Sequence, residues 1–393
     1  MKKISVLLLF LLMLGHVIAQ NRKIEFVEKP WKEIQAMAKE QNKIIFLDGF
    51  ASWCGPCKWM AKNMFTKDSV ADFYNKYFIC ASIDMEKGEG KELAKKYQIR
   101  VYPTLLFLDS AGNMLHRKAG APQRVQDYIE LGDIAMNPEN RMGTMEKRYQ
   151  AGERSAEFIY NYVKQLNEAY LPTQQVLEEY FSKQQEKDLI NRENWKMIYA
   201  FTNSPESREF NYLLQHRQDF INRYAADSVN QKIVSVIENS LTQLIKGGKI
   251  SDSIYDQAKA QVRALGIPGA DKALFGTDLM FYSIKQQKSK FLEVTYNDLD
   301  KYYHNDPDML NNIAWYYTSM TTDPKFLNKA TEWSKRANEL KKDPSYLDTY
   351  AVLLDKTGKK EEAIRQEKSA IELARSQGKT AGQFEARLKE FEK

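Results

Sequence analysis

The spacing of apolar residues divides the chain into an N-terminal part that contains strands and a longer part that is helical. Between residues 24 and 135, short apolar runs, which predict buried strands, alternate with segments whose apolar residues recur every three or four positions, which predict amphipathic helices. The predicted strands cover residues 43–50, 78–84, 105–108 and 114–117. The predicted helices cover residues 31–41, a segment around 60–65, and residues 70–77, 91–97 and 122–135. This alternation, with a final hairpin, indicates an α/β domain.

Beyond residue 135 the pattern changes. Residues 137–143 contain Pro, Gly and two Asn and predict a linker. After the linker, apolar residues recur at helical spacing, and strand patterns are scarce. Glycine-containing breaks at residues 246–249 and 266–269 divide the helices. We therefore expect residues 137–300 to form a helical domain.

Residues 301–393 contain an internal repeat. Ile313-Ala-Trp315 aligns with Tyr350-Ala-Val352 at an offset of 37, and Ala330 aligns with Ala363 at an offset of 33. The pattern resembles tetratricopeptide repeats, whose unit is about 34 residues. Such arrays usually present a concave surface to a partner, so a protein ligand of these repeats is expected. The alternative is that the helices only stack and support the N-terminal domain.

The first 19 residues are typical of a signal peptide. Lys2 and Lys3 precede an apolar run at residues 4–14, which is shorter than the roughly 20 residues that span a bilayer. We expect cleavage after Ala19, export, and a periplasmic location in a bacterium. An uncleaved membrane anchor is the less favoured alternative, because the apolar run is short.

The net charge of +6 comes from 58 basic and 52 acidic residues that are spread along the chain. Such a small, dispersed excess does not favour a nucleic-acid partner. Three cysteines in 393 residues also exclude a disulfide-stapled scaffold, so the fold depends on its apolar core.

Two of the three cysteines, Cys54 and Cys57, lie in a Cys-Gly-Pro-Cys motif between a predicted strand and a predicted helix. The first turn of a helix has free N–H groups and a favourable dipole, which stabilise a thiolate and lower the pKa of a cysteine. A zinc site would need further ligands at suitable spacing. The other candidate ligands of the mature chain are all isolated: Cys80, His116, His216 and His304. Metal binding is therefore a minor alternative to redox chemistry.

Trp53-Cys-Gly-Pro-Cys-Lys58, the Tyr102-Pro103-Thr104 segment and the order of elements resemble the thioredoxin family over residues 24–135. The expected fold is thus a thioredoxin-like α/β domain at residues 20–136, followed by the all-α repeat region. Within the family, the helix expected at residues 31–41 and the spacing of Met60, Phe65 and Val70 look closer to a subgroup that includes the periplasmic C-terminal domain of a transmembrane reductase.

The resemblance implies roles for the residues of the motif. Cys54 is expected to be the exposed nucleophile that forms a mixed disulfide with a client, and Cys57 to resolve that intermediate. Asp48 stands at the place of the buried carboxylate that accepts the proton of Cys57; the alternative is a structural polar residue at a strand end. Pro103 is expected to follow a cis peptide bond in a loop that receives the client chain as an extra strand.

Further expectations concern the neighbours of these residues. Trp53 and Tyr102 are expected to contact the client. The family often pairs its buried carboxylate with a lysine on the next strand, and counting back from Asp84 places Cys80 there. Without that lysine, Asp48 is expected to hold its proton more tightly. Cys80 is expected to be an inert core thiol.

The Gly-Pro pair between the cysteines resembles the reducing members of the family. The sequence therefore predicts an exported thiol–disulfide oxidoreductase that reduces client proteins and is recharged by a membrane electron donor. The Cys54–Cys57 disulfide would be its redox centre, with no separate cofactor. The alternatives are a disulfide oxidase or isomerase, and a helical-repeat binding scaffold in which the thioredoxin-like domain is mainly structural.

Overall fold

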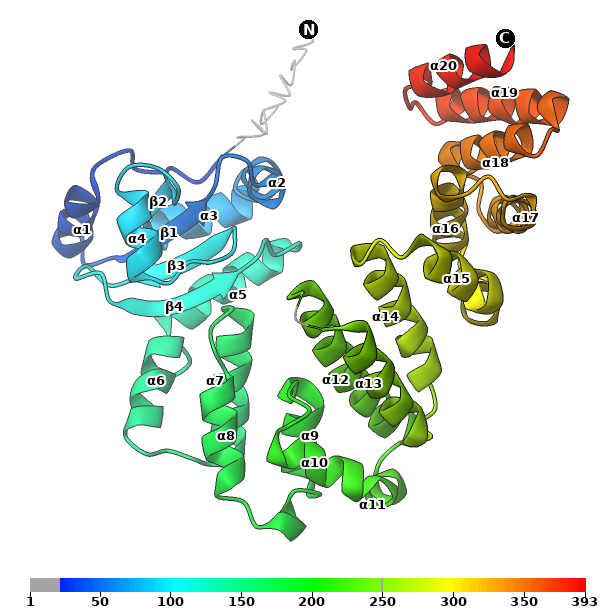
Figure 1. Ribbon diagram of the computed structural model, residues 1–393. Helices are drawn as coiled ribbons and strands as arrows, with labels where there is room; N and C mark the ends of the chain where they lie inside the picture. Colours follow the sequence, from blue (N-terminus) through cyan, green and yellow to red (C-terminus); the bar gives the residue numbers. More distant parts are fainter. Residues whose placement is uncertain (1–21, 249) are drawn as a thin grey trace, which may run out of the picture. The chain divides into compact units, whose positions relative to one another are not determined.

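The structure is a computed structural model that describes residues 22–248 and 250–393 (Figure 1). The expected signal peptide at residues 1–19 lies outside the described residues. The chain divides into two compact units, of which the first ends at Met197 and the second covers Ile198–Lys393. In the described ranges, every helix is too short or too polar to cross a membrane.

A mixed sheet forms the centre of the N-terminal domain. In the described part of the first unit it has four strands, in the order β2-β1-β3-β4. Their bounds are Ile44–Phe50 for β1, Phe78–Asp84 for β2, Thr104–Leu108 for β3 and Met114–Ala119 for β4. Strand β1 runs parallel to β2 and antiparallel to β3, and β3 pairs antiparallel with β4 as the predicted hairpin.

Helices cover both faces of this sheet. They are α1 (Trp31–Glu40), α2 (Gly55–Asn63), α3 (Asp68–Tyr77), α4 (Gly90–Lys96) and α5 (Val125–Met136). Phe46 of β1 packs with Tyr74 of α3 and Tyr128 of α5 in one cluster, whereas its neighbour Leu47 packs with Ile34 of α1 in another. Successive strand residues point to opposite faces, so the apolar run of β1 serves two cores. The predicted α/β fold is confirmed.

The rest of the first unit is helical. It contains α6 (Met142–Gln150), α7 (Ala156–Glu168), α8 (Gln174–Ser182), a short 3-10 helix (Glu186–Asp188) and most of α9 (Arg192–Phe201). The linker predicted at residues 137–143 is too long by two residues, because α6 already begins at Met142. That residue is buried, and its backbone amide donates a hydrogen bond to Nδ1 of His116 in β4.

The second unit is helical throughout its described residues. Its first helices are α10 (Arg208–Gln215), α11 (Arg217–Arg223), α12 (Ala226–Lys246), α13 (Asp252–Ala264), α14 (Ala270–Ile284) and α15 (Lys288–Tyr303). The remaining helices are α16 (Pro307–Met320), α17 (Pro324–Leu340), α18 (Pro344–Lys356), α19 (Lys360–Ser376) and α20 (Gly382–Phe391). The predicted all-helical character of this part is confirmed. The division into domains at residues 136 and 300 stays a prediction, and α15 runs across the second of these positions.

Asp-Pro pairs define the starts of three helices in the predicted repeat region. Asp306, Asp323 and Asp343 each accept a hydrogen bond from a backbone amide of the first turn, and each is followed by proline. Proline fits there because the first helical turn has no partner for that N–H group. Helices α16 and α17 pack together, as do α18 and α19, which agrees with two helix pairs.

Candidate functional site

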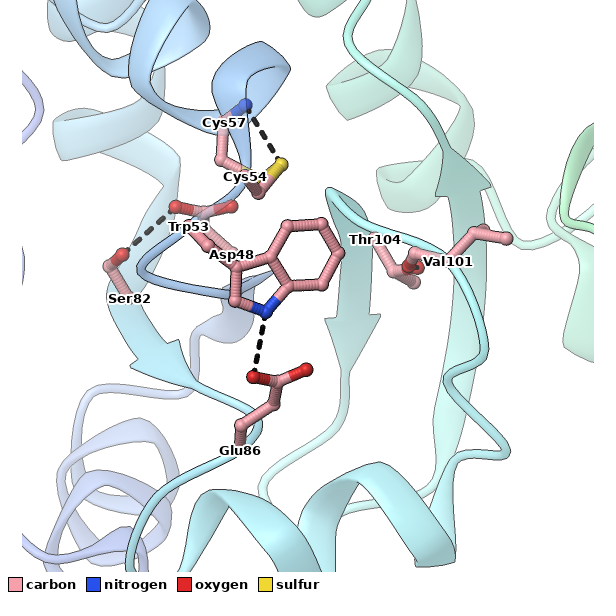
Figure 2. Close-up of a disulfide and its surroundings, with 8 residues drawn as sticks. All are labelled: Asp48, Trp53, Cys54, Cys57, Ser82, Glu86, Val101 and Thr104. Atoms are coloured by element: carbon pink, nitrogen blue, oxygen red, sulfur yellow. Dashed lines mark hydrogen bonds between the residues drawn. A yellow bond between two sulfur atoms is a disulfide. The ribbon is translucent and has the colours of Figure 1, made fainter.

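The two cysteines of the motif lie where β1 leads into α2 (Figure 2). They are joined by a disulfide, with their Cα atoms 5.3 Å apart. Cys54 is the N-cap of α2, and its Sγ atom accepts a hydrogen bond of 3.2 Å from the backbone amide of Cys57. Pro56 occupies the first turn, where its missing N–H group costs nothing. The strand-to-helix placement predicted for the motif is confirmed.

One expectation about the pair is wrong. Cys54 was expected to be exposed, but in this disulfide state only 2% of it is accessible, against 5% of Cys57. The two sulfurs are bonded to each other, and Phe50 and Tyr102 pack against the cluster that Ala51, Cys54 and Cys57 form. These aromatic neighbours contribute to the burial of Cys54 in the oxidised protein.

Asp48 lies in β1, six residues before Cys54, with its carboxyl on the side that faces the cysteines in Figure 2. The residue is 4% exposed, and Oδ2 accepts a hydrogen bond of 2.9 Å from the hydroxyl of Ser82. Oδ1 has no hydrogen-bond partner among the described residues. Burial raises the pKa of Asp48 to about 7, although the bond from Ser82 acts in the opposite direction. The direction agrees with the expectation that Asp48 holds its proton tightly.

The register of the sheet corrects the expected neighbour of Asp48. Ser82 pairs with Asp48, whereas Cys80 pairs with Phe46. The direct strand neighbour of Asp48 is therefore Ser82, and Cys80 lies two residues earlier on β2. Ser82 was missed, although it is a polar residue inside the predicted buried run, and that was the available signal. Cys80 is a buried free thiol whose pKa burial raises to about 12, as expected of an inert core thiol.

The Pro103 loop lies at the start of β3. The Tyr102–Pro103 peptide bond is cis, as the resemblance implied. Thr104 donates a hydrogen bond of 2.7 Å to the carbonyl of Val101, and the Pro103 carbonyl accepts one of 2.8 Å from Gly120. The first bond lies within the loop, and the second ties the loop to the residue that follows β4. Tyr102 brings the loop to the cysteines, since its ring packs against their cluster.

Trp53 is the largest exposed side chain of the motif, with 68% of its surface accessible. Its ring stands edge-on to Tyr102, with centroids 5.8 Å apart. Its Nε1 donates a hydrogen bond of 2.8 Å to Glu86, as Figure 2 shows. No sequence signal marked Glu86, because it stands in an ordinary charged turn after β2. The structure thus brings Cys54, Cys57, Trp53, Tyr102 and Pro103 together.

The four isolated candidate metal ligands belong to different parts of the chain. Cys80 is in β2, His116 in β4, His216 between α10 and α11, and His304 after α15. Over residues 22–248 and 250–393, no group of three or more His, Cys, Asp or Glu side chains has a geometry that could hold a metal ion.

Comparisons with known proteins point to one family. Residues 31–131 match the family of thioredoxin-like domains. The H-type thioredoxin of Oryza sativa subsp. indica is 35% identical over 94 residues, which make up 24% of this chain and 68% of that protein. The thiol:disulfide interchange protein DsbD of Yersinia pestis (strain Pestoides F) is 36% identical over 110 residues, which are 28% of this chain and only 18% of DsbD.

Among solved structures, a candidate disulphide-isomerase from Bacteroides thetaiotaomicron is 39% identical in sequence. The match covers 30% of this chain and 98% of that one, with a TM-score of 0.28. The sequence matches and the geometry concern the same region, which contains the paired cysteines and the cis-proline loop. Through residues 31–131, the chain belongs to the thioredoxin family.

Proposed function

We propose that the protein is an exported thiol–disulfide oxidoreductase that reduces disulfides in client proteins. The observation that carries the proposal is the Cys54–Cys57 disulfide at the start of α2, next to the aromatic ring of Tyr102 in the Pro103 loop. A bonded pair at a helix start, beside a cis-proline loop, suits reversible exchange with a client chain.

The proposed reaction moves two electrons from the reduced pair to the client. The Cys54 thiolate attacks one sulfur of the client disulfide, and the other client sulfur leaves as a thiolate. Cys57 then loses its proton and attacks Cys54. This step breaks the mixed disulfide, restores the Cys54–Cys57 bond and releases the client with two thiols.

Asp48 is the proposed acceptor for the proton of Cys57. With its pKa raised to about 7, the carboxyl is near the pH at which a general base works best. Its burial in β1 and its single hydrogen bond from Ser82 leave Oδ1 able to take the proton. Pro103, Tyr102 and Trp53 would position the client beside Cys54.

The direction of electron flow and the location rest on sequence features. Gly-Pro between the cysteines favours a reductant, and the signal-like residues 1–19 favour the periplasm. A reductant in an oxidising compartment needs a membrane electron donor to recharge it. The helical repeats would hold a protein ligand.

The equilibrium reduction potential of the pair, measured against glutathione or dithiothreitol, tests the direction. A value below about −220 mV supports a reductant, and a value above about −180 mV would instead favour an oxidase or isomerase.

Trapping tests the mechanism. We expect the Cys57→Ser variant to accumulate a mixed disulfide with a client, because nothing resolves it. Cys54→Ser is the matched control and should trap none. Function that survives Cys54→Ser would favour the binding scaffold.

A further inference from the structure

The end of α7 lies at the same edge of the sheet as the Pro103 loop. Lys118 of β4 forms an ion pair of 2.9 Å with Glu168, the last residue of α7. Lys118 is followed by Ala119, which pairs with Thr104, the residue after Pro103. The segment that leaves α7 is therefore fixed beside the loop that we propose receives the client.

A cavity of about 520 Å³ opens between these two segments. Arg100, three residues before Pro103, lines it from the domain of residues 31–131. Asn167, Tyr170, Leu171 and Pro172 line it from the α7–α8 connection. We call this cavity the Arg100–Tyr170 groove. The α7–α8 connection thus supplies one wall of the groove, and this connection lies outside the thioredoxin-like domain of residues 31–131.

Tyr170 has an unusual backbone for an aromatic residue. Its φ is +53°, and it closes α7 by donating to Asn167 while Leu171 donates to Leu166. Glycine normally occupies this turn, and it does so after α6, at Gly152, and after α18, at Gly358. The side chain is 64% exposed, so packing does not compensate for the strain. A strained, exposed aromatic residue at the rim of a groove is typical of a contact surface.

Arg100 provides the charge of the groove. It is exposed and has no hydrogen-bond or ion-pair partner among residues 22–248 and 250–393, whereas nearby Lys118 is paired with Glu168. A free guanidinium in such a place binds a carboxylate with two parallel hydrogen bonds.

We propose that the Arg100–Tyr170 groove binds the client segment that flanks the disulfide, and that it selects segments with a carboxylate next to an aromatic or aliphatic side chain. The inference rests on the proposed function, because the client strand would continue from the Pro103 loop into the groove. Tyr170 and Leu171 would cover the apolar side chain, and Arg100 would pair with the carboxylate.

The test compares two disulfide-linked peptides, one with Asp and Phe beside the cysteine and one with Lys and Gly there. The small neutral disulfide bis(2-hydroxyethyl) disulfide, which has neither a carboxylate nor a ring, provides the reference. For Tyr170→Gly and for Arg100→Gln, we expect the ratio of kcat/KM for the Asp-Phe peptide to that for the small disulfide to fall about tenfold, mainly through KM. The Lys-Gly peptide should show no such fall.

Gln286→Gly is the matched control. Gln286 closes α14 in the second unit with the same turn and a φ of +55°, so the change removes the same strain far along the chain from the groove. It should leave the ratio unchanged. An unchanged ratio for Tyr170→Gly and Arg100→Gln, or an equal fall with Gln286→Gly, would overturn the inference.

Binding separates this inference from the proposed function. The Asp-Phe peptide, with its thiols blocked and a fluorescent label, should bind the Cys54→Ser protein more tightly than the Cys54→Ser, Tyr170→Gly protein, as measured by anisotropy. If wild type reduces no disulfide, the proposed function fails, while this comparison still decides whether the groove binds the peptide. Equal affinities would overturn the groove.

Discussion

The carboxyl of Asp48 couples the stability of the first unit to pH. Burial raises its pKa from 3.8 to about 7, so the folded protein keeps a proton that the unfolded chain releases over that range. The resulting stability is fully present below pH 3.8 and is lost as the pH rises through 7. At alkaline pH, the folded protein must therefore hold a buried carboxylate that has one hydrogen bond, from Ser82, among the described residues.

Replacing Asp48 with Asn should remove this dependence. We expect Asp48→Asn to unfold with a higher free energy than wild type at pH 8, by on the order of 4 kcal/mol, and with a similar one at pH 4. Urea unfolding of the oxidised proteins at both pH values measures the difference. Asp133→Asn, an exposed substitution in α5, is the control and should show no such trend. An equal gain in the free energy of unfolding of Asp48→Asn at both pH values would contradict the raised pKa of Asp48.

At the scale of elements, a glycine lets α6 pack against β4. A Cβ atom on Gly143 would lie 2.6 Å from the carbonyl oxygen of Met114, which is backbone and has little freedom to move. We expect Gly143→Ala to lower the free energy of unfolding by about 1–3 kcal/mol, measured by urea denaturation. In α14, the nearest atom to a Cβ on Gly276 is a side-chain oxygen of Glu238 at 3.8 Å. Gly276→Ala should therefore stabilise by up to about 1 kcal/mol, and a similar gain for Gly143→Ala would contradict the packing argument.

Helix α20 is held in part by a charged cluster. Arg387 of α20 contacts Asp348 of α18 at 3.3 Å, and Asp348 is close to the buried Glu367 of α19. Burial is the main cause that raises the pKa of Glu367 to about 8, and the charge of Asp348 is the next. The stability that protonated Glu367 contributes is therefore lost as the pH rises through 8. In the Arg387→Met variant, two carboxylates would then face each other with no cation.

Hydrogen exchange measures the attachment of α20. We expect Arg387→Met to reduce amide protection in α20, and to do so more at pH 9 than at pH 6 after correction for the intrinsic exchange rate. Arg375→Met is the control, because it removes an exposed ion pair between Arg375 of α19 and Glu385 of α20. A loss of protection that is the same at both pH values would show that Glu367 does not ionise as described.

The elements of the first unit could be predicted because their signals are local. The apolar run that contains Phe46 and Leu47 predicted β1, and the Cys54–Cys57 motif after it predicted the start of α2. Contacts between distant segments could not be predicted in this way. The pairing of Asp48 with Ser82 depends on strand register, which the packing of both sheet faces sets. The burial of Cys54 depends on Tyr102, 48 positions later in the sequence.

At the scale of the whole molecule, the two units should respond separately to reduction. The disulfide lies in the first unit, and the second has its own core, which includes Phe281, Tyr317 and Trp333. Closing so short a loop stabilises by about 2 kcal/mol, so we expect dithiothreitol to lower the Tm of one transition by roughly 4–8 °C and to leave the other unchanged.

Differential scanning calorimetry with and without dithiothreitol measures both transitions. The Cys54→Ser, Cys57→Ser double variant is the control and should not respond to the reductant. A single transition that shifts as a whole would mean that the two units unfold as one cooperative body.

Because Cys80 is buried, its alkylation can measure how often the thioredoxin-like domain of the oxidised protein opens. The other two cysteines, Cys54 and Cys57, are bonded to each other, so a maleimide added in excess meets one free thiol. That thiol is enclosed between the sheet and its helices. Each alkylation event therefore records one excursion of the domain that exposes β2. At maleimide concentrations where the rate of mass gain no longer rises, that rate would report how often the domain opens, in unmodified wild-type protein and without denaturant.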